Sequence, residues 1–255
     1  MPVGVADVEG YGNWVQAEPL DDSVTDVGVR GEPSIDAIAA LRPDLVLATE
    51  DLPAAAVSQI EAFAPVLLVT PADTAKGMGQ MRENLQLVAT ATGKEAEAQE
   101  QLAAFDAKLA EGAEAVAAAD LAGRPFAFAD AYLDGSQLSI RPFAEGSLVS
   151  DVTEQLGLTN AWPEPGDPAY GLASTDVESL TVLGDVEFFY YTNDAEGPDP
   201  FGDALAGNAV WQSLPFVQNG NVHRLPDGIW MFGGPSSMTR YVDAVVAALT
   251  APPAG

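Results

Sequence analysis

The chain has 255 residues, 47% of them hydrophobic, which is enough for one or two domains with a substantial core. Thirty-eight acidic residues against ten basic ones give a formal net charge of −28, which repels polyanions and argues against nucleic acid as a partner. The chain contains no cysteine, which excludes disulfides, thiolate metal sites and a cysteine nucleophile, and no apolar run is long enough to predict a membrane span.

The N-terminal part alternates short strands and short helices. Strands are expected at 3–7, 45–49 and 66–69, and helices at 34–41 and 53–62. Ser34 is the expected N-cap of the first helix, and Pro43 ends it. The segment from Glu9 to Asp26 is expected to be a long polar loop that carries Tyr11 and Trp14. This alternation favours a parallel α/β sheet.

A long helical stretch is expected from 76 to 119, because the segment is rich in Ala, Glu, Gln and Leu. Gly93 and the region of Gly112 are its weak points. Its apolar residues recur at helical spacing, at Leu102, Phe105, Leu109 and Val116. Heptads do not persist along the stretch, so a rigid connecting helix between two lobes fits better than a coiled coil.

The C-terminal part returns to strands and helices. Strands are expected at 125–129, 137–140, 186–191 and 222–225, and helices at 149–156, 209–214 and 235–249. One pattern occurs twice, at 34–48 and at 176–190: a short helix, a Pro or Gly break, an Asp and an apolar strand. This similarity predicts two lobes of like construction with a ligand cleft between them. The predicted division is an N-terminal lobe at 1–92, a linker helix at 93–119 and a C-terminal lobe at 120–255.

Signs of catalysis are missing from the sequence. The single histidine, His223, lies in a predicted edge strand and is expected to be structural. No nucleophile elbow, P-loop or dinucleotide-binding glycine motif follows a strand, and one imidazole is too few for a histidine-based metal site. An α/β hydrolase or a chelate-modifying enzyme would need a nucleophile–base pair, and none is found. We therefore expect no enzyme, no catalytic residue and no metal site.

Arg30 stands out because cations are scarce in this chain. It lies between a possible strand and a helix, which is the carboxyl end of a parallel strand, where α/β folds bind ligands. Its planar fork of donors suits clustered oxygen atoms. Equally well, Arg30 could form a surface ion pair with Asp26 or Glu32.

An ordered set of motifs spans nearly the whole chain and resembles the ferric hydroxamate siderophore-binding proteins of ABC transporters. Each motif alone is modest, and the order carries the similarity. The motifs are Tyr11-Gly-Asn-Trp14, the segment from Asp26 to Asp36, Arg42-Pro-Asp-Leu-Val46, Leu158-Thr-Asn-Ala-Trp162, Tyr170-Gly171, Val210-Trp-Gln-Ser-Leu-Pro-Phe-Val217 and Arg224-Leu-Pro-x-x-Ile-Trp230.

The resemblance implies two Rossmann-like lobes with central parallel sheets, joined by a single long helix, and a shallow cleft lined by aromatic residues. Arg30 matches the family arginine that touches the iron-bound oxygens. Trp14, Tyr170 and Trp230 match aromatic positions of the cleft, Tyr11 belongs to the first motif, and Arg141 follows a predicted strand that could face the cleft. An aromatic residue expected near Leu52 is absent.

The same resemblance implies partners and a location. One acidic residue per lobe, Asp36 and Glu178, would pair with the ABC permease subunits. Glu178 is also expected to form a capping box with Thr175, and both roles can hold at once. The protein would be extracytoplasmic, either periplasmic or a cell-surface lipoprotein, although the sequence shows no signal segment. The family's first strand and helix, which would precede Val3, are expected to be missing from the N-terminal lobe.

The expected ligand is a ferric siderophore of the hydroxamate type, with iron carried only inside the chelate and no cofactor. A ferric trihydroxamate is neutral or cationic, whereas a ferric tris-catecholate carries about three negative charges and would be repelled by the acidic protein. Cobalamin or haem on the same fold, or a scaffold that no longer binds a ligand, are the alternatives.

Overall fold

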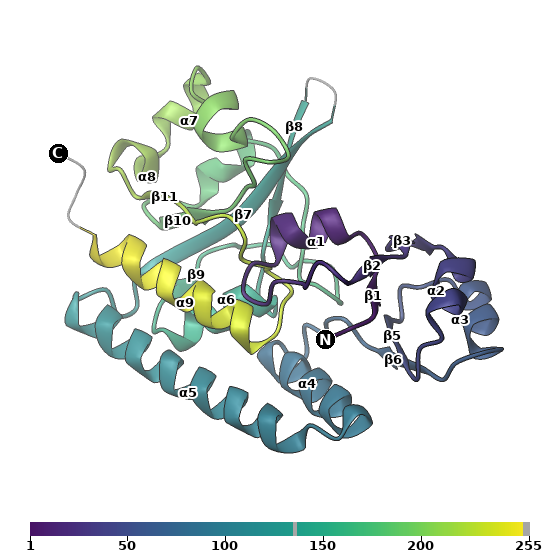
Figure 1. Cartoon of the computed structure of the whole chain (residues 1–255). Coiled ribbons are helices and arrows are strands. Elements are labelled where there is room, and N and C mark those ends of the chain that lie inside the picture. Colours follow the sequence, from purple (N-terminus) through teal and green to yellow (C-terminus); the bar gives the residue numbers. More distant parts are fainter. Residues whose placement is uncertain (135–136, 252–255) are drawn as a thin grey trace.

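The computed structural model describes residues 1–134 and 137–251, which form two α/β lobes. Figure 1 shows the N-terminal lobe on one side of the molecule and the larger C-terminal sheet on the other, with two long helices running below them. Among the described residues, no helix combines the length and the apolar character that a membrane crossing requires.

The N-terminal lobe is built from pairs of short strands. Two pairs are parallel, β1 (Gly4–Val5) with β2 (Thr25–Asp26) and β5 (Val46–Thr49) with β6 (Val66–Val69), and one is an antiparallel hairpin of β3 (Gly28–Val29) and β4 (Glu32–Pro33). Helices α2 (Ile35–Leu41) and α3 (Ala54–Glu61) pack on these pairs. The small core is centred on Val27, Ile38 and Ile60. The predicted cap is confirmed, because the Ser34 hydroxyl accepts a hydrogen bond from the Ala37 N–H.

The expected polar loop at 9–26 is partly wrong, because α1 (Val8–Trp14) forms there. Its two glycines, Gly10 and Gly12, give the segment low helix propensity. Asp7 compensates by accepting a hydrogen bond from the Gly10 N–H at 3.1 Å, which satisfies one of the free donors at the helix start. Trp14 is therefore held at the end of a short helix.

The expected helical stretch is present as two helices, α4 (Met78–Thr92) and α5 (Glu95–Ala118). The predicted weak point at Gly93 is the break, with a left-handed φ of 67° that suits glycine. Helix α5 buries Phe105, Leu109 and Val116 in the same cluster as the C-terminal sheet. The division into an N-terminal lobe, a linker helix and a C-terminal lobe, with boundaries at residues 92 and 119, stays a prediction.

The C-terminal lobe has a five-stranded sheet in the order β11-β10-β7-β8, with β9 also pairing with β7. All pairs are parallel except that of β7 with β8. The strands are β7 (Pro125–Asp134), β8 (Gln137–Pro142), β9 (Thr159–Asn160), β10 (Glu187–Tyr190) and β11 (Val222–Arg224).

Both faces of this sheet are covered. Phe126, Phe128 and Phe189 face a cluster shared with α5, α6 (Leu148–Gln155) and α9 (Pro235–Thr250). Alternate residues, including Ala127 and Phe188, face a second cluster. That cluster is covered by the short helices η1 (Glu178–Val182), η2 (Pro200–Ala204), α7 (Ala209–Ser213) and α8 (Pro215–Gln218). This two-residue period is typical of a strand buried on both sides.

The duplicated pattern is present in both lobes, as α2 followed by β5 and as η1 followed by β10. The capping box expected at Thr175 is wrong. Thr175 exchanges two backbone hydrogen bonds with Ile140, and the Asp176 carboxylate accepts from the Ser179 N–H at 3.0 Å instead. Glu178 is exposed in the first turn of η1.

Candidate ligand-binding site

A cleft of about 1030 Å³ lies between the two lobes and is lined by residues of both. It lies at the carboxyl ends of the parallel strands. Thr49 and Val69 end β5 and β6, while Tyr191 follows β10 directly, and Trp230 lies on the loop after β11. The loops that follow the strands meet at this edge of the sheet. Open α/β sheets usually bind their ligands at this edge.

A row of five aromatic rings forms one wall of the cleft. Tyr170 lies 5.3 Å from Phe232, and Phe232 lies 5.3 Å from Trp230, measured between ring centroids. Trp14 continues the row, 6.4 Å from Trp230 and 5.2 Å from Tyr191. Most of these pairs are edge-to-face, a favourable arrangement that holds the rings in place. The row combines rings from both lobes, because Trp14 belongs to α1 and the other four rings belong to the C-terminal lobe.

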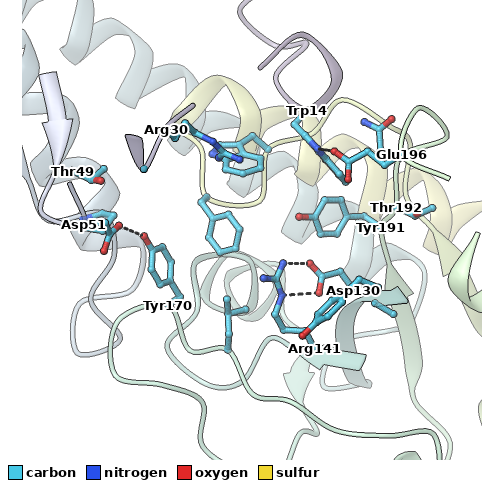
Figure 2. Close-up of a pocket in the computed structure, with 18 of the residues that line it drawn as sticks. Trp14, Arg30, Thr49, Asp51, Asp130, Arg141, Tyr170, Tyr191, Thr192 and Glu196 are labelled. Carbon is cyan, nitrogen blue, oxygen red and sulfur yellow. Dashed lines mark hydrogen bonds and ion pairs between the residues drawn. The ribbon is translucent and has the colours of Figure 1, made fainter. Parts of the chain in front are cut away.

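Arg30 lies on the turn between β3 and β4 and points into the cleft (Figure 2). Its Cζ lies 5.6 Å from the centre of the Trp230 ring, a cation–π contact between the lobes. Its Nε lies 3.4 Å from Asp7 Oδ2, so its ion pair is with Asp7 rather than with Asp26 or Glu32. The side chain is 66% exposed, which leaves its donors accessible to a ligand.

Arg141 also lines the cleft, but its guanidinium is bound to Asp130. The two residues are direct partners in the antiparallel register of β7 and β8. Arg141 Nε donates to Asp130 Oδ1 at 2.9 Å and Nη2 donates to Oδ2, a two-pronged pair. Burial raises the pKa of Asp130, while the hydrogen bonds from Arg141 act in the opposite direction. The Arg141 charge is therefore largely compensated within the wall.

Two hydrogen bonds cross the cleft between the lobes (Figure 2). The Tyr170 hydroxyl donates to Asp51 Oδ2 at 2.9 Å, and the Trp14 indole Nε1 donates to Glu196 Oε1. Burial, followed by the bond to Asp51, raises the pKa of the Tyr170 hydroxyl, so this hydroxyl stays protonated and remains a donor at neutral pH. Both carboxylates thus accept from neutral donors, and neither forms an ion pair with the side chains that the structure describes.

Tyr11 is the one predicted ligand-binding residue outside the lining of this cleft. Its hydroxyl donates to the Glu18 carbonyl oxygen at 2.7 Å. It lines a neighbouring hollow of about 430 Å³ behind Trp14, Arg30 and Trp230. A direct role of Tyr11 in the main cleft stays a prediction.

Asp36 and Glu178, the predicted docking residues, are exposed and do not line the cleft. Each lies in the first turn of its helix, α2 in one lobe and η1 in the other. In the structure these two carboxylates therefore lie on the surface, apart from the ligand-binding residues.

Sequence reasoning missed several lining residues, among them Asp51, Asp130, Tyr191, Glu196 and Phe232. Asp51 and Tyr191 could have been found as polar or aromatic positions within two residues of the end of an apolar strand. The carboxylates gave no signal, because acidic residues occur throughout this chain.

His223 is confirmed as a half-buried residue on the edge strand β11. Its Nε2 lies 2.7 Å from Glu187 Oε2, and Arg124 Nε donates to Glu187 Oε1 at 2.9 Å. The residue does not line the cleft. In the described parts of the chain, no three histidine, aspartate or glutamate side chains are arranged to hold a metal ion.

Comparison with known proteins gives consistent matches over nearly the whole chain. A family model described as periplasmic binding protein matches residues 3–228. The iron(3+)-hydroxamate-binding protein FhuD of Escherichia coli is 25% identical over 242 residues, which covers 95% of this chain and 78% of the relative.

Solved structures agree in fold. The Fe3+–Desferal-bound siderophore-binding protein FhuD from Vibrio cholerae has a TM-score of 0.83 and 28% identity, covering 98% of this chain and 90% of its own. The triscatecholate siderophore-binding protein FeuA from Bacillus subtilis has a TM-score of 0.74 at 22% identity, covering 98% and 85%, which supports the fold alone.

Proposed function

The chain belongs to the periplasmic binding protein family, and from that premise we propose that it is an extracytoplasmic substrate-binding protein that captures a ferric siderophore for an ABC import permease. The observation that carries the proposal is the inter-lobe cleft with Arg30 beside a row of aromatic rings. The hydroxamate-binding relatives from Escherichia coli and Vibrio cholerae support the hydroxamate type of ligand. In the native form the protein would be periplasmic or a cell-surface lipoprotein.

The chelate would fill the coordination sphere of the iron, so the protein would supply no metal ligand and need no cofactor. Arg30 would donate charge-assisted hydrogen bonds to the hydroxamate oxygens around the iron. Its present partner Asp7 is a loose one, at 3.4 Å, and can be replaced by ligand oxygens. Trp14, Tyr170 and Trp230 would pack against the aliphatic segments of the chelate. Arg141 would shape the cleft as part of its pair with Asp130.

Electrostatics favours a hydroxamate over a catecholate. The protein carries a formal charge of −28, and the cleft is lined by two arginines and three carboxylates. A ferric tris-catecholate, with about three negative charges, would enter against this field, whereas a neutral or cationic trihydroxamate would not.

Asp36 and Glu178 would dock the loaded protein on the permease. They are exposed, one on each lobe, and lie apart from the cleft. A permease with one basic residue for each lobe could therefore contact both without displacing the ligand.

Haem bound through histidine or methionine does not fit this cleft. Axial ligation of haem iron uses side chains such as histidine or methionine. Neither residue type is found among the described residues that line the cleft, and His223 is bound to Glu187 on the edge strand.

Tryptophan fluorescence tests the proposal. Trp14 and Trp230 line the cleft, while Trp211 is buried in the second core cluster. A ferric trihydroxamate should quench the fluorescence saturably, and its iron-free form and a ferric tris-catecholate should not. The Trp14→Phe/Trp230→Phe variant should lose most of the quenching, whereas Trp211→Phe should keep it. Absence of a response to the ferric trihydroxamate in the folded protein, with no binding by calorimetry, would overturn the proposal.

A further inference from the structure

The cleft contains charges of both signs, but only some of them are compensated. Arg141 is engaged by Asp130 on both prongs, and Arg30 contacts Asp7 and the face of Trp230. Among the described residues, Asp51 accepts a side-chain hydrogen bond only from the neutral Tyr170 hydroxyl, and Glu196 only from the neutral Trp14 indole. Two negative charges therefore face the ligand space without a cation among the residues that the structure describes.

Resting on the proposed function, we infer that the cleft selects ferric hydroxamate chelates that carry a protonated amine, and that Asp51 and Glu196 receive this cationic arm. The two carboxylates lie on opposite sides of the cleft, Asp51 on the N-terminal lobe and Glu196 on the C-terminal lobe (Figure 2). If the iron centre of the chelate lies near Arg30, an ammonium arm that extends toward either lobe would reach a carboxylate.

The geometry of the carboxylates suits this role. Each is oriented by one hydrogen bond from an aromatic side chain. The carboxylate therefore loses less conformational entropy when the ligand binds. A carboxylate has two oxygens and about four acceptor sites, which leaves capacity for the donors of an ammonium group. The adjacent rings of Tyr170 and Trp14 add faces to which a cation is attracted.

The expected effect is moderate, because both carboxylates are exposed to solvent. Exposed ion pairs change an equilibrium constant by up to about fivefold each, so the two together should give about tenfold selectivity. Screening by salt should reduce this selectivity.

The test compares two probes that differ at the end of one arm, which is a charged ammonium group in one and a neutral acetamide in the other. Ferric desferrioxamine B carries a terminal ammonium group, and its N-acetylated form is neutral. Calorimetric titration of the wild-type protein at about 0.1 M salt should give a Kd lower for the amine than for the acetylated chelate, by about tenfold. The ratio of the two Kd values is the readout, so general changes of affinity cancel.

The variants remove charge and keep the neutral hydrogen bonds. Asp51→Asn retains an acceptor for Tyr170, and Glu196→Gln retains one for Trp14. In the double variant the Kd ratio should fall toward one, with each single variant in between. Glu114→Gln, on the exposed face of α5 and outside the cleft, changes the net charge by as much as each single variant and should keep the wild-type ratio.

The outcomes distinguish a failure of the inference about Asp51 and Glu196 from a failure of the proposed siderophore-binding function. If the wild-type protein binds both chelates with equal affinity, or the double variant keeps the full ratio, the inference about Asp51 and Glu196 is overturned while the siderophore-binding function stands. If the wild-type protein binds neither chelate, the proposed function fails first.

Discussion

Arg30 is held at the cleft by weak, replaceable contacts rather than by a buried ion pair. The turn between β3 and β4 projects it from the N-terminal lobe, and its contacts are Asp7 at 3.4 Å and the Trp230 ring at 5.6 Å. With 66% of its side chain exposed, its removal leaves no buried charge behind. Its effect on binding can therefore be measured separately from its effect on folding.

We predict that Arg30→Ala weakens the binding of a ferric trihydroxamate by about tenfold to a hundredfold, because charge-assisted hydrogen bonds to the ligand oxygens are lost. The free energy of unfolding should change by less than about 0.5 kcal/mol. Calorimetric titration and urea denaturation measure the two effects. Arg240→Ala, on an exposed position of α9, serves as the matched control and should leave the affinity unchanged. Unchanged affinity of Arg30→Ala would assign the iron-bound oxygens to another residue.

Glu187 on β10 contacts His223 on the neighbouring strand β11 and Arg124, which directly precedes β7, and it carries a shifted pKa. It is 7% exposed, accepts from Arg124 at 2.9 Å and lies 2.7 Å from His223 Nε2. Burial alone would raise its pKa, but the hydrogen bonds from His223 and Arg124 lower it below the ordinary value of 4.5. The unfolded chain therefore takes up this proton at a higher pH than the folded protein does.

It follows that the Glu187 carboxylate stabilises the fold above about pH 4.5 and that this contribution is lost as the pH falls through the folded-state pKa. Urea denaturation between about pH 5.5 and about pH 3 should show a steeper loss of unfolding free energy in the wild-type protein than in Glu187→Gln. The exposed Glu114→Gln serves as the control and should keep the wild-type slope. Equal slopes for wild-type protein and Glu187→Gln would contradict the lowered pKa.

Among the elements, α5 approaches α6 and α9 so closely that a glycine is required at the contact. A Cβ atom on Gly112 would lie 2.7 Å from Leu156 Cδ2 and 2.9 Å from Val242 Cγ1, and both neighbours are fully buried. In the sequence this glycine looks like a weak point of the helix. The packing shows instead that it lets α5 settle on the core of the C-terminal lobe.

Gly112→Ala should lower the free energy of unfolding by about 1–3 kcal/mol, because the added methyl group overfills a packed contact. Gly79→Ala in α4 is the matched control, since the nearest atom to its Cβ would be 3.8 Å away. There the gain in helix propensity should stabilise the protein by up to about 1 kcal/mol. Urea denaturation at neutral pH measures both. A Gly112→Ala protein as stable as the wild type would mean that α5 can shift away from α9 at no cost.

The elements that the sequence predicts well are those with strong local signals. The strand at 66–69 and the helix capped by Ser34 were predicted with their observed limits, from an apolar run and from capping chemistry. Helix α1 was missed because its two glycines hide a helix that depends on the Asp7 cap. The short β9 gives too little pattern to detect.

The residues of the candidate site likewise divide into those that the sequence predicts and those that it does not. Arg30, Trp14, Tyr170 and Trp230 were found because scarce or large side chains stand in ordered motifs, and all four line the cleft. The Arg141–Asp130 pair could not be predicted, since it depends on the register of β7 with β8. Asp51 and Glu196 meet their partners only once the lobes are in place.

For the molecule as a whole, several hydrogen bonds join the two lobes outside the aromatic wall of the cleft. Thr74 Oγ1 donates to the Pro168 carbonyl oxygen at 2.8 Å, and the Met78 N–H donates to Asp151 at 2.7 Å. The Asn193 side-chain amide also donates to the Asn13 carbonyl oxygen at 2.8 Å. Opening or closing the cleft by a large hinge rotation would break these bonds, so the lobes should move little.

We therefore predict that ligand binding changes the radius of gyration by less than about 1 Å, as in other preorganised complexes. Small-angle X-ray scattering with saturating ferric trihydroxamate measures this, and the iron-free chelate at the same concentration is the control. Because a charge of −28 makes the molecules repel one another, the data need about 0.3 M salt and extrapolation to zero protein concentration. A contraction of several ångströms would show that the inter-lobe bonds yield to the ligand and that the lobes close as hinged bodies.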